Sequence, residues 1–267
     1  MNRKTKEGMR LKMTIDLEKA KEEFIKYTEH YNLTDKNLDG KQKHSLRVMQ
    51  VSEQIAKDLK LDKEEIELAS LIGLLHDIAR FEQYTRYKTF RDMDSIDHGD
   101  YGVEILEKDI RKYIETSQYD EIIKKAVKNH NKYKIEEGLS EKEELFAKII
   151  RDADKIDIFY ESVEIFWNEK KDIIENSTIT EDVIKQFNEC TQIKRRKERR
   201  VENSVNEIVS VIAFIFDINF KESLRIIKNE NYVNKILDRY NIKDEYTKNE
   251  IEKIRTKANE YIEEKSI

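Results

Sequence analysis

Four histidines and two aspartates of this 267-residue chain are spaced so that helices would direct them inward. His44 stands four and seven residues before Val48 and Val51, which places it on the apolar stripe of a helix. In the run GLLHDIAR, His76 and Asp77 are adjacent among leucines. Burying ionisable groups is unfavourable unless something pairs with them. The residues that need such a partner are His44, His76, Asp77, His98, His130 and Asp154.

Asp154 sharpens this pattern, because Ile150 and Ile158 lie four residues before and after it on the same helical row. A single buried histidine is more often a hydrogen-bonded core residue than a ligand. Several helices that each direct an imidazole or a carboxylate inward favour a metal centre instead. Such a donor set suits one or two divalent transition metals, Mn, Fe, Co, Ni or Zn, better than Mg. His30 shows no comparable spacing and serves as a control.

The composition predicts that helices position these residues. The chain has no proline, six glycines and 40% charged residues, which is typical of a helix-rich protein with almost no sheet. Capping residues precede several segments: Asp62, Asp97 and Ser140, the last with Glu143 at capping-box spacing. Helices are expected near 15–31, 41–60, 63–82, 98–115, 119–131, 141–168, 180–200, 203–229 and 230–264, the last with an interruption.

Charge and cysteine content exclude some classes of function. The net charge of −5 argues against binding nucleic acid over the whole surface. Cys190 is the single cysteine, so it has no partner for an internal disulfide or a CxxC zinc site, and a reducing cytoplasm is expected. The basic residues 1–13 are not followed by an apolar stretch long enough for a signal peptide or a membrane span.

The order of the candidate ligands resembles that of the HD-domain superfamily of metal-dependent phosphohydrolases. Its pattern of a His, a His-Asp pair and a distant Asp falls on His44, His76, Asp77 and Asp154, and two-metal members add two histidines where His98 and His130 stand. The phrases HSLRV, LLHDIARFE and DADKID are similar to those of bacterial HD proteins. The resemblance covers roughly residues 38–168.

The resemblance implies an all-α HD-domain core with additional C-terminal helices. Residues 1–37 would be an N-terminal helix packing on the core, 38–168 the HD domain, and 169–267 a helical extension or lid. It also implies that His44, His76, Asp77 and Asp154 hold the first ion, while Asp77 bridges to a second ion on His98 and His130.

The implied reaction is hydrolysis of a phosphate ester or phosphoanhydride. A bound metal lowers the pKa of water from about 15.7 towards about 7, which would make hydroxide the nucleophile at neutral pH. Arg80, Lys155 and Arg47 are the expected phosphate contacts, and Asp77, Arg80 and Lys155 the expected catalytic residues; salt bridges are the alternative for the three cations. Arg80 stands where many two-metal relatives have lysine and a nucleotidase subgroup has an acid. That departure favours a phosphodiester or polyphosphate over a deoxynucleoside monophosphate.

The segment FEQYTRYKTFRDMDSID is expected to be a polar loop between two ligand positions. Arg86 and Tyr87, with Arg91, would stack on a base or hold a phosphate; packing of the tyrosines on the core is the alternative. No general acid can be chosen among the nearby carboxyls, which are Asp94, Asp97, Asp100 and Asp157.

The last hundred residues lie outside the resemblance. VSVIAFIF, residues 209–216, is apolar on every face and is expected to be buried against the core. KRRKERR, residues 194–200, is expected to be a solvated surface; if it faces the cleft it would attract anions up to a short oligonucleotide.

Three functions remain open. The favoured one is a two-metal phosphohydrolase acting on a nucleotide, dinucleotide or related small phosphate ester. The same ligand set also serves a mixed-valent di-iron oxygenase in some HD proteins. The third is a non-catalytic nucleotide sensor, against which a full ligand set argues. The sequence leaves the oligomeric state open.

Overall fold

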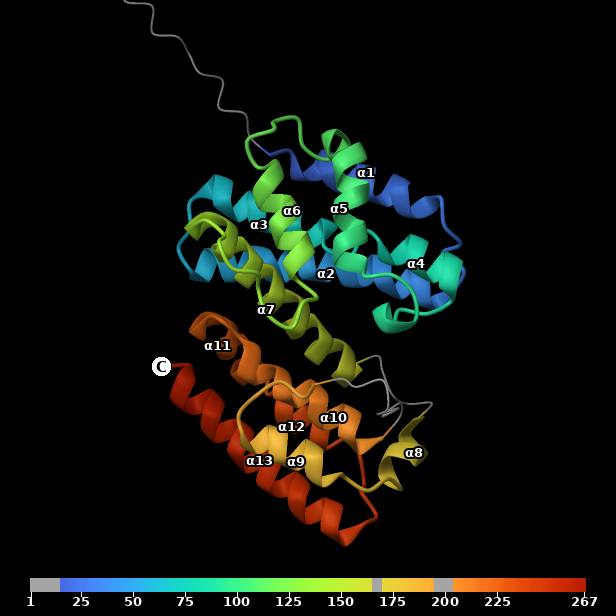
Figure 1. The fold of residues 1–267 in the computed structure, drawn as a ribbon. Helices are drawn as coiled ribbons and strands as arrows, with labels where there is room; N and C mark the ends of the chain where they lie inside the picture. Colours follow the sequence, from blue (N-terminus) through green and yellow to red (C-terminus); the bar gives the residue numbers. More distant parts are fainter. Residues whose placement is uncertain (1–14, 165–169, 195–203) are drawn as a thin grey trace, which may run out of the picture.

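A computed structural model describes residues 15–164, 170–194 and 204–267. Within these ranges every regular element is a helix and there is no strand, so the predicted all-α class is confirmed. Figure 1 shows one group of helices formed by the first half of the chain and a second group formed by the last hundred residues, with the long helix α7 (Glu141–Glu164) reaching from one to the other. In the described residues, no helix is long and apolar enough to cross a membrane.

The first group is built around α7, α2 (Lys36–Asp58), α3 (Lys63–Leu75) and α6 (Asp120–Asn129). Helix α2 packs on α3 and α7, and α6 packs on α7 and on α5 (His98–Asp109). Helix α1 (Leu17–Glu29) lies against α3. Helix α2 begins five residues earlier than expected, because Asp35 accepts a hydrogen bond from the amide of Asn37 and caps it. The domain boundary predicted at residue 38 therefore falls inside the first turn of α2.

Apolar burial holds this group together. Leu68, Leu71 and Leu74 of α3 and Val48 and Ile55 of α2 are fully buried. Each such side chain contributes about 1.5–3 kcal/mol relative to an exposed one. Burial of these side chains thus stabilises both α2, which carries His44, and α3, which His76 follows.

The prediction of one helix over residues 63–82 is wrong. Helix α3 ends at Leu75, residues 76–79 form a turn, and α4 (Arg80–Tyr87) starts anew inside the segment expected to be a loop. The imidazole of His76 explains the break, because its Nδ1 donates to the carbonyl of Gly73, the acceptor that the amide of Asp77 would use in a continuing helix. His76 and Asp77 consequently project from a turn.

The described residues from 171 onward form a second group of helices, mostly short: α8 (Lys171–Glu175), α9 (Glu181–Asn188), α10 (Val205–Ile212), the 3-10 helix η4 (Ala213–Asp217), α11 (Lys221–Asn229), α12 (Tyr232–Leu237) and the longer α13 (Glu245–Lys265). Helix α7 packs on α10, α11 and α12. VSVIAFIF spans α10 and η4 and is largely buried, as its composition predicts.

Two expected helices in this half are shorter than predicted. The helix over 180–200 ends at Asn188, and Cys190 has a left-handed backbone with φ of 52°. The helix over 203–229 is interrupted before α11, where Asp152 accepts the amides of Asn219 and Phe220. The expected interruption within 230–264 falls between α12 and α13. Residues 165–169, with the predicted boundary at 168, and residues 195–200 of the basic run lie outside the described ranges.

Candidate metal centre

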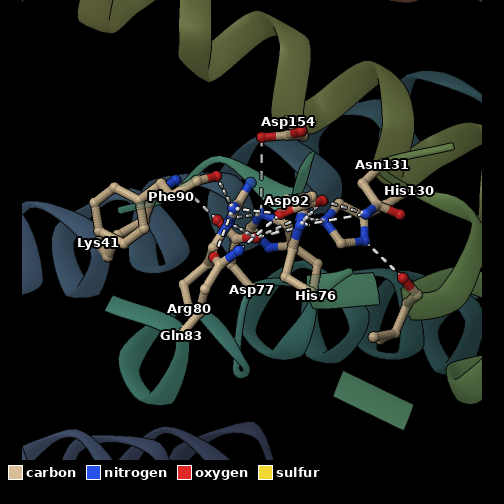
Figure 2. A network of polar contacts seen from close by, with 12 residues as sticks. Lys41, His76, Asp77, Arg80, Gln83, Phe90, Asp92, His130, Asn131 and Asp154 are labelled. Carbon is tan, nitrogen blue, oxygen red and sulfur yellow. Dashed lines mark hydrogen bonds and ion pairs between the residues drawn. The ribbon is translucent and has the colours of Figure 1, made fainter. Parts of the chain in front are cut away.

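The fold brings the six predicted ligands together from separate elements. Figure 2 labels four of them, His76, Asp77, His130 and Asp154. Two of them come from long helices, His44 from the middle of α2 and Asp154 from the middle of α7. The other four stand at helix ends. His76 and His130 are the residues after α3 and α6, Asp77 follows His76, and His98 is the first residue of α5.

Asp77 lies at the centre of the arrangement and its two carboxylate oxygens face different histidines. Oδ2 lies 3.6 Å from Nε2 of His44 and 3.7 Å from Nε2 of His76. Oδ1 lies 3.3 Å from Nε2 of His98 and 3.4 Å from Nε2 of His130. The carboxylate therefore joins two groups of potential ligands, each with its own pair of imidazoles.

Within each group the donor atoms converge closely. In the first group, Nε2 of His44 lies 3.2 Å from Nε2 of His76 and 3.2 Å from Oδ1 of Asp154. In the second, the Nε2 atoms of His98 and His130 lie 2.9 Å apart. We call these the first position (His44, His76, Asp77, Asp154) and the second position (Asp77, His98, His130).

The other ring nitrogen of each histidine has a fixed partner. Nδ1 of His76 donates to the carbonyl of Gly73 at 2.8 Å, and Nδ1 of His130 donates to the carbonyl of Val127 at 2.6 Å. A carbonyl can only accept, so these rings carry their proton on Nδ1 and leave a lone pair on Nε2.

The remaining two histidines use carboxylates in the same way. Nδ1 of His44 bonds Oδ2 of Asp157, and Nδ1 of His98 bonds Oδ2 of Asp92, both at 2.6 Å. Metal-bound histidines characteristically donate their second ring nitrogen to a carboxylate or a carbonyl. The four imidazoles are thus oriented as ligands, and with two carboxylates they fit the donor set of divalent transition metals.

The electrostatic environment keeps most of these groups in their ligating forms. Burial lowers the pKa of His98 to about 3 and also lowers that of His76, so both rings are neutral at pH 7. Burial alone would raise the pKa of Asp77, but Lys41, His76 and Arg80 hold it well below its usual range. Asp77 is therefore an anion inside the core.

His44 behaves differently from the other rings. Burial and Lys41 act to lower its pKa, but the hydrogen bonds that the ring donates to Asp154 and Asp157 outweigh them and raise it to about 9. Binding of a divalent cation at the first position would have to displace this proton, so metal affinity there is expected to fall at acid pH.

A lysine that the sequence reasoning missed lies in the centre. Nζ of Lys41 is 2.9 Å from Oδ2 of Asp77, and its side chain retains 21% exposure. Nε of Arg80 lies 3.3 Å from the other oxygen, Oδ1. The ring of Phe90 is next to both cations, which Figure 2 shows on the side of Asp77 away from His130. Lys41 stands three residues before His44 on the same helical face, and that spacing was the available signal.

Asp92 is a second residue that the sequence reasoning missed. Besides His98 it accepts hydrogen bonds from Arg80 at 3.0 Å and from Gln83 at 2.9 Å, and Gln83 is fully buried. Arg80 also donates to the carbonyl of Phe90. The segment expected to supply aromatic groups to a substrate therefore supplies a carboxylate that orients the candidate ligand His98. The sequence around Asp92 does not distinguish it from the neighbouring aspartates.

Of the four carboxyls considered as general acids, only Asp157 reaches a ligand among the described contacts. Asp94 pairs with Arg91, while Asp97 and Asp100 both pair with Lys132. The carboxylate of Asp157 accepts hydrogen bonds from Nδ1 of His44 and from Nε and Nη2 of Arg47. These contacts lower the pKa of Asp157 despite its burial. Asp157 is therefore an anion that is placed to orient the ring of His44.

The other predicted substrate contacts lie further from the ligands. Arg47 is engaged by Asp157 and Glu161. Nζ of Lys155 lies 2.8 Å from Asp217 of η4, against the C-terminal helices. Arg86 pairs with Glu82 and is more than half exposed, and Tyr87 is 45% exposed. Among the predicted cations, Arg80 is the one that contacts a ligand directly, so the roles of Lys155, Arg86 and Tyr87 stay predictions without a supporting contact.

Comparison with known families agrees with this geometry. Residues 42–158 match the family model described as the HD domain, a stretch that starts two residues before His44 and ends four residues after Asp154. No curated protein and no solved structure is significantly similar to the chain.

Proposed function

Residues 42–158 of this chain form an HD domain, and from this premise we propose that the protein is a two-metal phosphohydrolase. Its substrate is a small phosphorylated molecule, a nucleotide or dinucleotide being the closest fit to the cations around the centre. The domain belongs to a superfamily of mostly metal-dependent phosphohydrolases.

The observation that carries the proposal is the placement of Asp77. One of its oxygens faces His44 and His76 and the other faces His98 and His130, so one carboxylate can serve two cations at once. Bound cations would supply an activated water and positive charge beside the phosphoryl oxygens. The chain itself supplies fixed imidazole tautomers and an ionised bridge.

Lys41 and Arg80 are the residues that would hold the substrate's phosphate. Both cations contact Asp77 and both remain partly accessible, with 21% and 15% of their side chains exposed. Arg80 is immobilised by the carbonyl of Phe90 and by Asp92, whereas the ammonium of Lys41 is a single point charge on a flexible stem. We therefore propose that Arg80 positions the phosphate, and that the ammonium of Lys41 moves between the carboxylate of Asp77 and a phosphoryl oxygen.

Asp154 marks the side from which a substrate would approach. Its side chain is 20% exposed, whereas those of His44, His76 and Asp77 are at most 3% exposed. The buried ligands favour a substrate that presents only a phosphate to the centre. We also propose a cytoplasmic location, because a reducing compartment would keep the exposed thiol of Cys190 free.

The test combines metal analysis with phosphate release. Protein purified without oxygen is expected to hold about two Mn, Fe, Co, Ni or Zn ions per chain and to release phosphate from members of a nucleotide and dinucleotide panel. Asp77→Asn, which keeps the shape but removes the charge, should lose both metal and activity while its helicity persists. About two irons per chain with no hydrolysis of any phosphate ester would refute the proposal and leave the di-iron oxygenase.

A matched pair of lysines tests the phosphate contact. Lys41→Met should raise KM at least tenfold, because one charge-assisted contact to phosphate is worth roughly 1.5–3 kcal/mol. Lys43→Met is the control, since Lys43 lies on the same helix with a 62% exposed side chain paired to Asp39. Equal KM values in the two variants would remove Lys41 from the substrate site.

A further inference from the structure

Arg151 is a buried arginine on α7 that the proposed chemistry does not use. It lies three residues before Asp154 and is 2% exposed. Its Nη1 donates to the carbonyl of Asn129 at 2.9 Å and to the carbonyl of Lys132, and lies 3.5 Å from the carbonyl of His130. One nitrogen of the guanidinium thus donates to two carbonyls of the turn that contains the candidate ligand His130 and lies close to a third.

These contacts have a clear physical role. Helix α6 ends at Asn129, and the last carbonyls of a helix have no partner within it. A cation at this end satisfies those oxygens and interacts favourably with the helix dipole. Without Arg151 the turn at 129–132 would keep buried carbonyls unpaired, and the backbone that carries His130 would lose its anchor.

The same turn also reaches the other imidazole of the second position. Nδ2 of Asn131 donates to Asp92 at 3.0 Å and to Asp97 at 3.0 Å. Asp92 is the carboxylate that receives Nδ1 of His98. A shift of residues 129–132 would therefore disturb both histidines of the second position. The described contacts of the turn reach the first position only through the shared Asp77 and the ring of His76.

Arg151 is in turn held from the C-terminal helices. Its Nη2 lies 2.7 Å from Oδ2 of Asp217 in η4, and Lys155 lies 2.8 Å from the same oxygen. Next to this pair, Asp152 accepts the amides of Asn219 and Phe220. Residues 217–220 are thus fixed to the face of α7 that carries Arg151.

From these contacts we infer that Arg151, held by Asp217, is a positioning residue for the second metal position. The C-terminal helices thereby affect the occupancy of the His98 and His130 half of the centre more than that of the first position, which Arg151 does not contact. The inference rests on the two-metal part of the proposed function and on no assumption about the substrate.

The experiment titrates the metal-free, full-length protein with Mn²⁺ and measures stoichiometry and affinity by electron paramagnetic resonance and calorimetry. The unmodified chain should bind two ions. Arg151→Lys keeps the charge but loses the planar fork, in which Nη1 reaches the carbonyls of the turn while Nη2 holds Asp217. The substitution should lower the affinity for one of the two ions by about 10–100-fold, which is the usual effect of losing a residue that orients a metal ligand.

A double-mutant comparison identifies which ion is affected. In a His130→Ala background, which already lacks the second position, adding Arg151→Lys should change the remaining affinity less than about twofold. In a His44→Ala background it should abolish most of the remaining binding. Arg47→Lys is the matched control, because the guanidinium of Arg47 contacts Asp157 beside His44 and should affect the first position instead.

Two results would overturn the inference. One is a folded Arg151→Lys protein that binds both ions as the parent does, and the other is an equal loss at both positions, which indicates a general structural role. If circular dichroism shows that Arg151→Lys does not fold, Asp217→Asn takes its place with the same expectation and the same overturning results. Two bound Mn²⁺ ions without phosphate release would refute the proposed function and leave this inference standing.

Discussion

Replacing Gly73 by alanine tests how the metal centre depends on the contact between α2 and α3. The space that the missing side chain of Gly73 leaves is filled by α2. A Cβ on Gly73 would lie 2.6 Å from Oγ of Ser52, 2.8 Å from the carbonyl oxygen of Val48 and 2.9 Å from Cα of Met49. Two of these three atoms belong to the backbone, so a rotamer change cannot relieve the contact.

The expected loss of stability follows from these distances. Ordinary contacts begin at 3.4 Å, so the backbone of α2 would have to recede by about 0.6 Å at Val48. Overpacking of this kind costs about 1–3 kcal/mol, and a backbone contact belongs at the upper end. Alanine recovers up to about 1 kcal/mol of helix propensity, which leaves a net loss of roughly 1–2 kcal/mol.

The same movement would act on the metal centre. His44 is on α2 and His76 follows α3, and their Nε2 atoms are 3.2 Å apart. A site of this kind needs its ligands held within about 0.5 Å of their working positions. The variant should therefore bind Mn²⁺ more weakly as well as unfold more readily.

Urea unfolding followed by circular dichroism, with and without Mn²⁺, measures both effects. Gly40→Ala is the control, because it lies on α2 with nothing within 4 Å of the added Cβ. That variant should gain about 0.5–1 kcal/mol. A Gly73→Ala protein as stable as Gly40→Ala would show that the contact of α2 with α3 is not tight and would refute the reasoning.

Three further predictions follow from particular contacts. Asp157→Asn should weaken Mn²⁺ binding about 10–100-fold in a titration of the metal-free protein, since Asp157 accepts the Nδ1 proton of His44; unchanged affinity would contradict that role. His30→Ala should leave metal content and activity unchanged, because His30 is exposed and bonds only the carbonyl of Lys26 among its described partners. Lys125 and Lys128 lower the pKa of Glu136 to about 2 from its ordinary 4.5, so its ion pairs stabilise the fold above pH 4.5 and are lost as the pH falls towards 2. The melting temperature of Glu136→Gln should accordingly fall less than that of the unmodified protein between pH 4.5 and 2, and parallel curves would disprove this.

Much of the convergence of the candidate ligands was predictable because helical periodicity is a local property of the chain. His44 and Asp154 each lie on a row of apolar residues at three- and four-residue steps, and a helix directs such a row to one side wherever it packs. Both residues point into the centre as that spacing predicts. The capping residues and the absence of proline likewise predicted helices, and every regular element in the described ranges is a helix.

The helix boundaries were less predictable, because side chains compete with the backbone for the same acceptors. The ring of His76 takes the carbonyl of Gly73 and ends α3. Asp152 takes the amides before α11 and divides an expected helix in two. Each of these side-chain hydrogen bonds depends on a ring or a carboxylate that packing brings into place, and the sequence alone does not reveal such placement.

The sequence by itself determined which residue types converge and that helices carry them. Only the tertiary structure decided that one oxygen of Asp77 faces each pair of histidines and that Lys41 contacts this carboxylate. It also decided that Lys155 pairs with Asp217 and not with the candidate ligands. These outcomes depend on how far neighbouring helices are rotated and how closely they approach. Rotation and approach are set by contacts between residues far apart in the sequence, such as Gly73 with the backbone of Val48, and no local pattern contains them.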